Sequence, residues 1–192
     1  TVSLNDGGEL KADIAVADPL TKRQLSGSVT VDDVQLAQFN PVLASLSPQL
    51  SASGTLSAEL QPRGTLQKPA LYGDIKLDAF TAQGQAVPLD MKPSNVMLHF
   101  EGDQSELIAD LETAQGKIRV SGNAQWSDPE NPTARVSVKG DKVRVSLPPY
   151  VTAHVTPDVE ASISLQNLNL SGSIQTVSYT HLRAHETRGN LV

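Results

Sequence analysis

The sequence of 192 residues contains no cysteine, and this absence excludes several kinds of chemistry at once. Disulfides, thiol nucleophiles and thiolate metal sites all need cysteine, so none of them can occur in this chain. A cysteine-free sequence is also compatible with any redox compartment.

Aromatic residues are scarce too, at 4% of the chain, whereas hydrophobic residues together make up 39%. Any hydrophobic core must therefore be built from valine, leucine, isoleucine and alanine. Charged residues account for 19% of the chain, and the net charge is −6. Binding to a phosphate backbone needs clusters of lysine and arginine. The sequence has no such cluster, so we expect no nucleic-acid partner.

The start of the chain has none of the features of a complete secreted or membrane protein. It has no initiator methionine, no signal peptide and no apolar run of about 18 residues that could span a membrane. We interpret the chain as a segment of a longer protein, so its lack of a signal says nothing about its location.

The last stretch of the chain differs in composition from everything before it. Residues 177–187 read Val-Ser-Tyr-Thr-His-Leu-Arg-Ala-His-Glu-Thr, which resembles the in-frame translation of a transposase-type sequencing adapter. We predict a native β segment over residues 1–176 and a non-native tail over residues 177–192, with a short C-terminal helix as the alternative. The tail contains His181 and His185, whose i, i+4 spacing would otherwise suit a metal pair. We predict no metal site.

Alternation of apolar and polar residues runs through the chain and predicts an almost entirely β protein. Ile118, Val120 and Ala124, for example, alternate with polar residues. The pattern predicts roughly eleven to thirteen strands of ordinary length. Short connections favour antiparallel pairing of neighbouring strands, and the segments around Gly102 and Gly140 are predicted to be tight turns.

One segment, residues 34–47, has helical spacing instead of alternation. It predicts one short helix that begins near Asn40, with Pro41 in its first turn, where proline is favoured. Such a helix is expected to cap one end of the sheet.

A loose repeat is visible, which consists of glycine, any residue and then an apolar–polar–apolar triplet. Its last copy, Gly172-Ser-Ile174, is shorter. Glycine at the start of a strand predicts a bulge or a bend in the sheet. The repeat occurs at Gly27, Gly54, Gly73, Gly122 and Gly172.

A sheet with one apolar face has to bury that face, and a single short helix cannot cover it. Two folds remain: a single long, curved, largely antiparallel sheet that forms an open trough, and a closed β-sandwich. The scarcity of aromatic residues favours the trough, because a sandwich core bridges faces about 10 Å apart with bulky side chains. An underfilled aliphatic trough suits a hydrocarbon chain, since each buried CH₂ contributes about 0.8 kcal/mol.

The apolar side of the strands is therefore the candidate binding surface. Each of these residues taken alone fits an ordinary core, and their shared side is what predicts a groove. The predicted lining consists of Leu56, Leu60, Ile75, Leu77, Val96, Leu98, Phe100, Leu107, Leu111, Ile118, Val120, Val136, Val138, Val143, Val145, Val159, Ile163 and Leu165.

No arrangement of residues points to catalysis. Asp110 and Glu112 share one strand face and are expected to face solvent together, and His99 lies on a polar face without a nucleophile nearby. The sequence has no phosphate-binding glycine loop, serine elbow or metal-ligand cluster. We expect no enzymatic activity, no catalytic residues and no cofactor.

The stretch Lys68–Leu77 resembles the element P-x-L-x-G-x-I-x-L that recurs in the AsmA-like/TamB family of envelope proteins. In that family a short helix and Ser-Gly-Thr-Leu often precede the element, as residues 39–46 and 53–56 do here. Residues 116–126 and 143–159 add further matches. The resemblance thus covers essentially the whole chain before the tail and points to the C-terminal conserved region of the family.

The resemblance implies a taco-like hydrophobic groove in a periplasmic protein that is anchored in the inner membrane. It implies that phospholipid acyl chains pass along this groove from the inner to the outer membrane, with a linked role in outer-membrane protein and autotransporter assembly. The implied partner is a TamA-like outer-membrane protein of the Omp85 family, contacted by parts of the chain outside this segment.

A chaperone or scaffold that adds client strands to an exposed sheet edge is the alternative function. Unpaired edges also predict an edge-to-edge dimer of the isolated segment.

Overall fold

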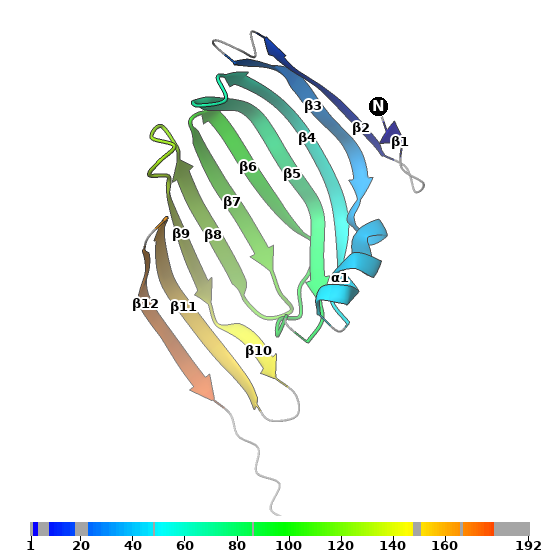
Figure 1. The fold of residues 1–192 in the computed structure, drawn as a ribbon. Helices are drawn as coiled ribbons and strands as arrows, with labels where there is room; N and C mark the ends of the chain where they lie inside the picture. The colour runs from blue at the N-terminus through cyan, green and yellow to red at the C-terminus, as the bar shows by residue number, and fades with distance from the viewer. Residues whose placement is uncertain are drawn as a thin grey trace, which may run out of the picture.

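The computed structural model describes residues 2–3, 8–17, 23–47, 49–85, 87–147, 151–165 and 167–178. Within them the chain forms one open, twisted antiparallel sheet that is bent into a trough (Figure 1). The predicted all-β trough is confirmed, and no second sheet packs on the first among these residues. The strands are β1 (Val2–Ser3), β2 (Glu9–Ala17), β3 (Gln24–Gln35), β4 (Ser51–Gly64), β5 (Pro69–Gln83), β6 (Ser94–Gly102), β7 (Gln104–Glu112), β8 (Lys117–Gln125), β9 (Thr133–Asp141), β10 (Val143–Leu147), β11 (Val151–Ser164) and β12 (Leu168–Ser178).

The strands follow the chain order from β1 to β9, so each of them pairs with its sequence neighbour. At the far end, β11 carries both β9 and β10 on one edge and β12 on the other. The strands β9 and β10 therefore lie end to end along β11. The predicted turn at Gly140 is wrong: Gly140 pairs with Ile118 inside β9. Lys142, with a φ of 46°, kinks the strand without reversing it.

The helical segment follows β3 and consists of η1 (Leu36–Phe39) and α1 (Asn40–Leu46). The helix begins at Asn40 as predicted, with Pro41 in its first turn. Asn40 Oδ1 accepts a hydrogen bond of 2.8 Å from the Ala52 N–H, which ties the helix start to β4. Figure 1 shows the helix at one end of β3, β4 and β5.

Bulges in two strands, β3 and β5, bend this half of the sheet. The extra residue lies around Asp33 in β3 and around Ala79 in β5, and the bulge in β5 shifts its pairing register with both β4 and β6. Asp33 and Ala79 have φ values of 50° and 52°, which is the left-handed region. An extra residue in one strand increases its twist and bends it, so these bulges contribute to the curvature of the trough.

The glycines of the sequence repeat mark further bends. Four of the five have φ values between 121° and 148°, and Gly122 is the exception. Gly73 shows why glycine is needed at such a bend, because a Cβ atom there would lie 1.9 Å from the carbonyl oxygen of Glu59 on β4. The neighbouring backbone occupies the position that any side chain would take.

The described residues contain no thick hydrophobic core. A closed sandwich of this length would bury many large side chains between its two sheets. Here most of the apolar side of the sheet stays half-buried. The hydrophobic residues that are buried are Val31, Val34, Ala109, Ile118, Val143 and Ala153.

Replacing Gly73 by alanine should lower the free energy of unfolding by about 2 kcal/mol or more, because a side chain would collide with the backbone of β4. Urea denaturation followed by circular dichroism measures this change. Gly122→Ala is the matched control: Gly122 lies outside the left-handed region, and its added Cβ would come no closer than 3.0 Å to a neighbouring atom. Equal losses in both variants would contradict this explanation of the bend.

Replacing Ala79 by glycine should raise the free energy of unfolding by about 0.5–1 kcal/mol. Relief of the left-handed conformation, worth about 1–2 kcal/mol, exceeds the entropy cost of glycine, about 0.5–1 kcal/mol. The same denaturation assay tests this result. Ala58, in β4, has no positive φ, so the control variant Ala58→Gly should be less stable than the wild type. A loss of stability in Ala79→Gly would contradict the proposed strain at the bulge.

Candidate functional site

The register of the sheet joins the predicted lining residues into three apolar rows that cross the strands. Directly opposite residues in neighbouring strands have Cβ atoms about 4.5–5.5 Å apart, so successive members of a row are neighbours. We call these three rows together the apolar band. The first row is Leu56, Leu77, Val96, Ala109, Val120, Val138 and Val159; the second is Ala58, Ile75, Leu98, Leu107, Gly122, Val136 and Ala161; the third is Leu60, Gly73, Phe100, Ser105, Ala124, Ala134 and Ile163.

The remaining predicted lining residues lie at the margins of the band. Leu111 pairs with Ile118 in a short fourth row, and Val143 and Val145 lie on β10. Val143 is fully buried and Ile118 is 9% exposed, so other atoms of the chain already cover both side chains. Leu165 lies just beyond β11 and is 70% exposed. The rows also contain small residues, such as Gly73, Ser105 and Gly122, which the apolar–polar alternation of the sequence did not identify as lining residues.

The two faces of the sheet differ in their exposure to solvent. Met97 and Ile108 are apolar residues on the opposite face of β6 and β7, and they are 40% and 38% exposed. Leu98 and Leu107, their neighbours in sequence, are half-buried. This difference indicates that the apolar band lies on the sheltered side of the curved sheet.

At one rim of the sheet, Trp126 draws β8 towards β5. Its indole N–H donates a hydrogen bond of 2.9 Å to the carbonyl oxygen of Pro69, and its backbone N–H donates one of 2.9 Å to Asp103. Its ring packs edge-on against Phe100, with ring centroids 6.3 Å apart. Three strand spacings would separate β5 from β8 by about 14 Å in a flat sheet. The sheet must therefore curl at this rim.

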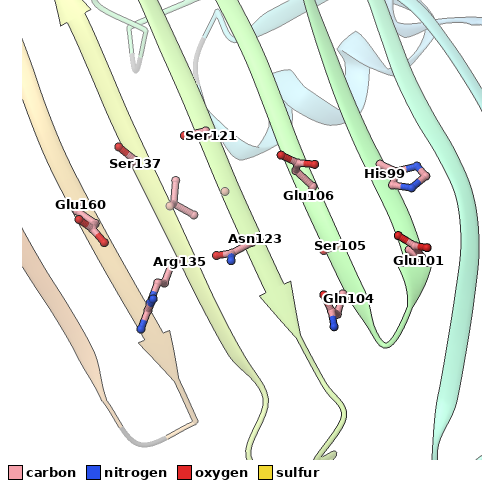
Figure 2. Close-up of a pocket in the computed structure, with 12 residues that line it drawn as sticks. His99, Glu101, Gln104, Ser105, Glu106, Ser121, Asn123, Arg135, Ser137 and Glu160 are labelled. Atoms are coloured by element: carbon pink, nitrogen blue, oxygen red, sulfur yellow. The ribbon is translucent and has the colours of Figure 1, made fainter.

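The opposite face carries a polar hollow of about 500 Å³ over β6, β7, β8, β9 and β11. Figure 2 shows carboxylate, amide, hydroxyl, imidazole and guanidinium groups around it. His99, Glu106, Asn123 and Arg135 form one cross-strand row within it. The hollow therefore offers hydrogen-bond donors and acceptors from acidic, basic and neutral side chains. In the part of the chain that the structure describes, no three histidine or acidic side chains are arranged to hold a metal ion.

Cross-strand ion pairs lie on this polar face. Because their side chains are exposed, they are expected to contribute little to stability. They place opposite charges directly across from one another, which favours the observed register. With nitrogen–oxygen distances of 2.6 Å, the pairs are Asp74–His99, Asp110–Arg119 and Glu112–Lys117.

The hydrogen bond from His99 to Asp74 raises the pKa of His99 above its ordinary value. Asp74→Asn should therefore shift the pKa of His99 downwards in an NMR titration of the ring protons, whereas Asp110→Asn should leave it unchanged. A raised pKa in the folded state means that the small stabilisation from this pair is complete below the unfolded-state pKa. It is lost as the pH rises through the folded-state pKa. An unchanged titration in Asp74→Asn would contradict the pairing.

Two family profiles match the chain on either side of the middle of the sheet. The TamB N-terminal domain matches residues 1–77, and the TamB C-terminal domain matches residues 103–191. Strands β5 and β6 connect the two matched parts by direct pairing, so both parts contribute to one continuous sheet.

The end of the chain was predicted to be a non-native tail from residue 177. Strand β12 extends to Ser178, and the C-terminal domain match continues to residue 191. His181 and His185 lie outside the described residues. The predicted boundary thus stays a prediction.

A curated relative with the name translocation and assembly module subunit TamB, from Haemophilus influenzae, is 24% identical to this chain over 173 residues. The alignment covers 90% of the chain but only 13% of that relative's length. No solved structure matches the chain significantly. Among the described residues, no helix is both long and apolar enough to cross a membrane. Because the TamB N-terminal and C-terminal domains match most of the chain in order, this chain belongs to the TamB family.

Proposed function

We propose that the apolar band binds phospholipid acyl chains and conducts them along the trough, from the inner to the outer membrane. The observation that carries this proposal is that three aligned apolar rows run across β4 to β11 with no second layer on them among the described residues. An acyl chain that lies on this surface removes apolar area from water. Each CH₂ group that becomes buried contributes about 0.8 kcal/mol of favourable free energy.

The composition of the rows suits movement as well as binding. Apolar contacts are non-directional, so an acyl chain can shift from one strand to the next without breaking a specific bond. Ser105 is the polar side chain within the three rows, and Gly122 has no side chain that could obstruct the path. The rows cross seven strands, which at about 4.8 Å each give a path roughly 30 Å long in this chain.

Family membership supports the setting of this function. We propose that the chain is part of a longer periplasmic protein that is anchored in the inner membrane. The whole protein would act in outer-membrane protein and autotransporter assembly, with a TamA-like outer-membrane protein of the Omp85 family as its partner. The name of the Haemophilus influenzae relative, a translocation and assembly module subunit, supports that role. On this proposal the segment is a binding surface and not an enzyme.

The exposed edge strand β12 favours a second candidate function, which is the binding of client β-strands by edge addition. One edge of β12 pairs with β11, and no described strand pairs with the other. Leu168, Leu170 and Ile174 on this strand are 69%, 71% and 62% exposed. An open edge with apolar side chains can accept a further strand, either from a client or from a second copy of the chain.

A charge placed in the apolar band should weaken lipid binding strongly. Leu98→Asp puts a carboxylate in the middle of the second row, and an unpaired charge against an acyl chain costs a few kcal/mol. At about 1.4 kcal/mol per tenfold change, phospholipid adducts seen by native mass spectrometry of the purified chain should fall by roughly tenfold or more. Met97→Asp is the matched control on the other face of β6, and its adducts should persist.

The same variants separate the two candidate functions. Leu98→Asp should leave strand binding at the β12 edge intact, because the substitution lies far from that edge in the strand order. A wild-type chain without phospholipid adducts would contradict the lipid path. A Leu98→Asp chain that has lost its β circular dichroism signal would instead assign Leu98 a purely structural role.

A further inference from the structure

The rim of the trough is uneven at the tip of the β6–β7 hairpin. The hairpin turns at Gly102, opposite Leu71, and β5 extends two residues further along the rim, to Pro69. Strand β8 ends level with the hairpin, because its last residue, Gln125, pairs with Gln104.

The indole of Trp126 crosses the tip of this hairpin. It reaches from the end of β8 to the carbonyl oxygen of Pro69, at the start of β5. The loops on both sides also approach each other. The pKa of Asp128 is lowered mainly by a hydrogen bond from Asn131 and, to a smaller extent, by the charge of Lys68 in the β4–β5 turn. One aromatic side chain therefore links the rims of β5 and β8 across the hairpin that lies between them.

The third row of the apolar band passes beside this indole. Phe100 is followed across the strands by Ser105 and Ala124, and Trp126 lies two residues beyond Ala124 on the same face. The two large rings contact each other, and two small side chains lie beside them in the row.

Two contacts fix the orientation of the indole. Its N–H makes a hydrogen bond to Pro69, and its ring makes an edge contact with Phe100. Trp126 is half-buried, so other atoms of the chain cover part of its side chain. A ring held in this way forms a wall at the rim end of the third row.

We propose that Trp126 is a wall of the acyl path at the rim of the trough and contacts an acyl chain lying over Ser105 and Ala124. This inference rests on the proposed lipid-binding function and adds a specific contact residue to it. Trp126 is a positioning residue in this scheme, because it confines the acyl chain to the trough at this rim.

The only tryptophan of the chain makes this contact directly measurable. Oleate and its dibrominated derivative have similar shapes, but bromine quenches indole fluorescence only on close approach. We expect dibrominated oleate to quench Trp126 and oleate to leave the emission unquenched. Native mass spectrometry of the same samples counts the bound fatty acid.

The control moves the single tryptophan to the opposite face of β6. In the double variant Trp126→Phe, Met97→Trp, dibrominated oleate should bind without quenching the new indole. The single variant Trp126→Phe keeps an aromatic ring against Phe100 but loses the hydrogen bond to Pro69. It should release bound oleate faster than the wild type while its circular dichroism spectrum stays unchanged.

The outcomes distinguish this inference from the proposed function. Bound dibrominated oleate without quenching of Trp126 would overturn the contact and leave the lipid path standing. An unchanged release rate in Trp126→Phe would overturn its role as a wall that confines the acyl chain. Absence of any bound fatty acid on the wild-type chain would overturn the proposed function itself.

Discussion

The apolar face of this sheet is the constraint on which the rest of the structure depends. Its three aligned rows expose aliphatic side chains across β4 to β11, and no second layer covers them among the described residues. A flat sheet of this kind would leave both faces equally open to water. Curvature is the remaining way to shelter one face, because it brings side chains on the inner side closer together.

The curvature is built from local departures from regular strand geometry. Asp33 and Ala79 adopt left-handed backbone conformations at bulges, and Gly73 is held where no side chain fits. Each departure weakens its own strand slightly, but the bends act on neighbouring strands together. At the opposite rim Trp126 draws β8 and β5 towards each other. The strained backbone at these positions is thus the cost of a curvature that shields the apolar band from water.

The polar face helps to fix the pairing register of the strands more than it adds to the stability of the fold. In a sheet with one apolar face, a register slip of one residue would turn a strand's apolar side chains outwards. The ion pairs Asp110–Arg119 and Glu112–Lys117 oppose such a slip between β7 and β8, since it would break both of them. Their exposure limits what they add to the free energy of folding.

The sequence by itself determined the strands, the face on which each apolar residue lies, and the start of the helix at Asn40, because alternation and the position of Pro41 are local signals. The family resemblance was readable for the same reason. Only the tertiary structure decided which residues share a row, since alternation does not specify the register between strands. It also showed Gly140 inside a strand and Val143 beneath other atoms of the chain. The contact of Trp126 with Pro69 joins residues 57 positions apart, and no local pattern encodes a contact over that separation.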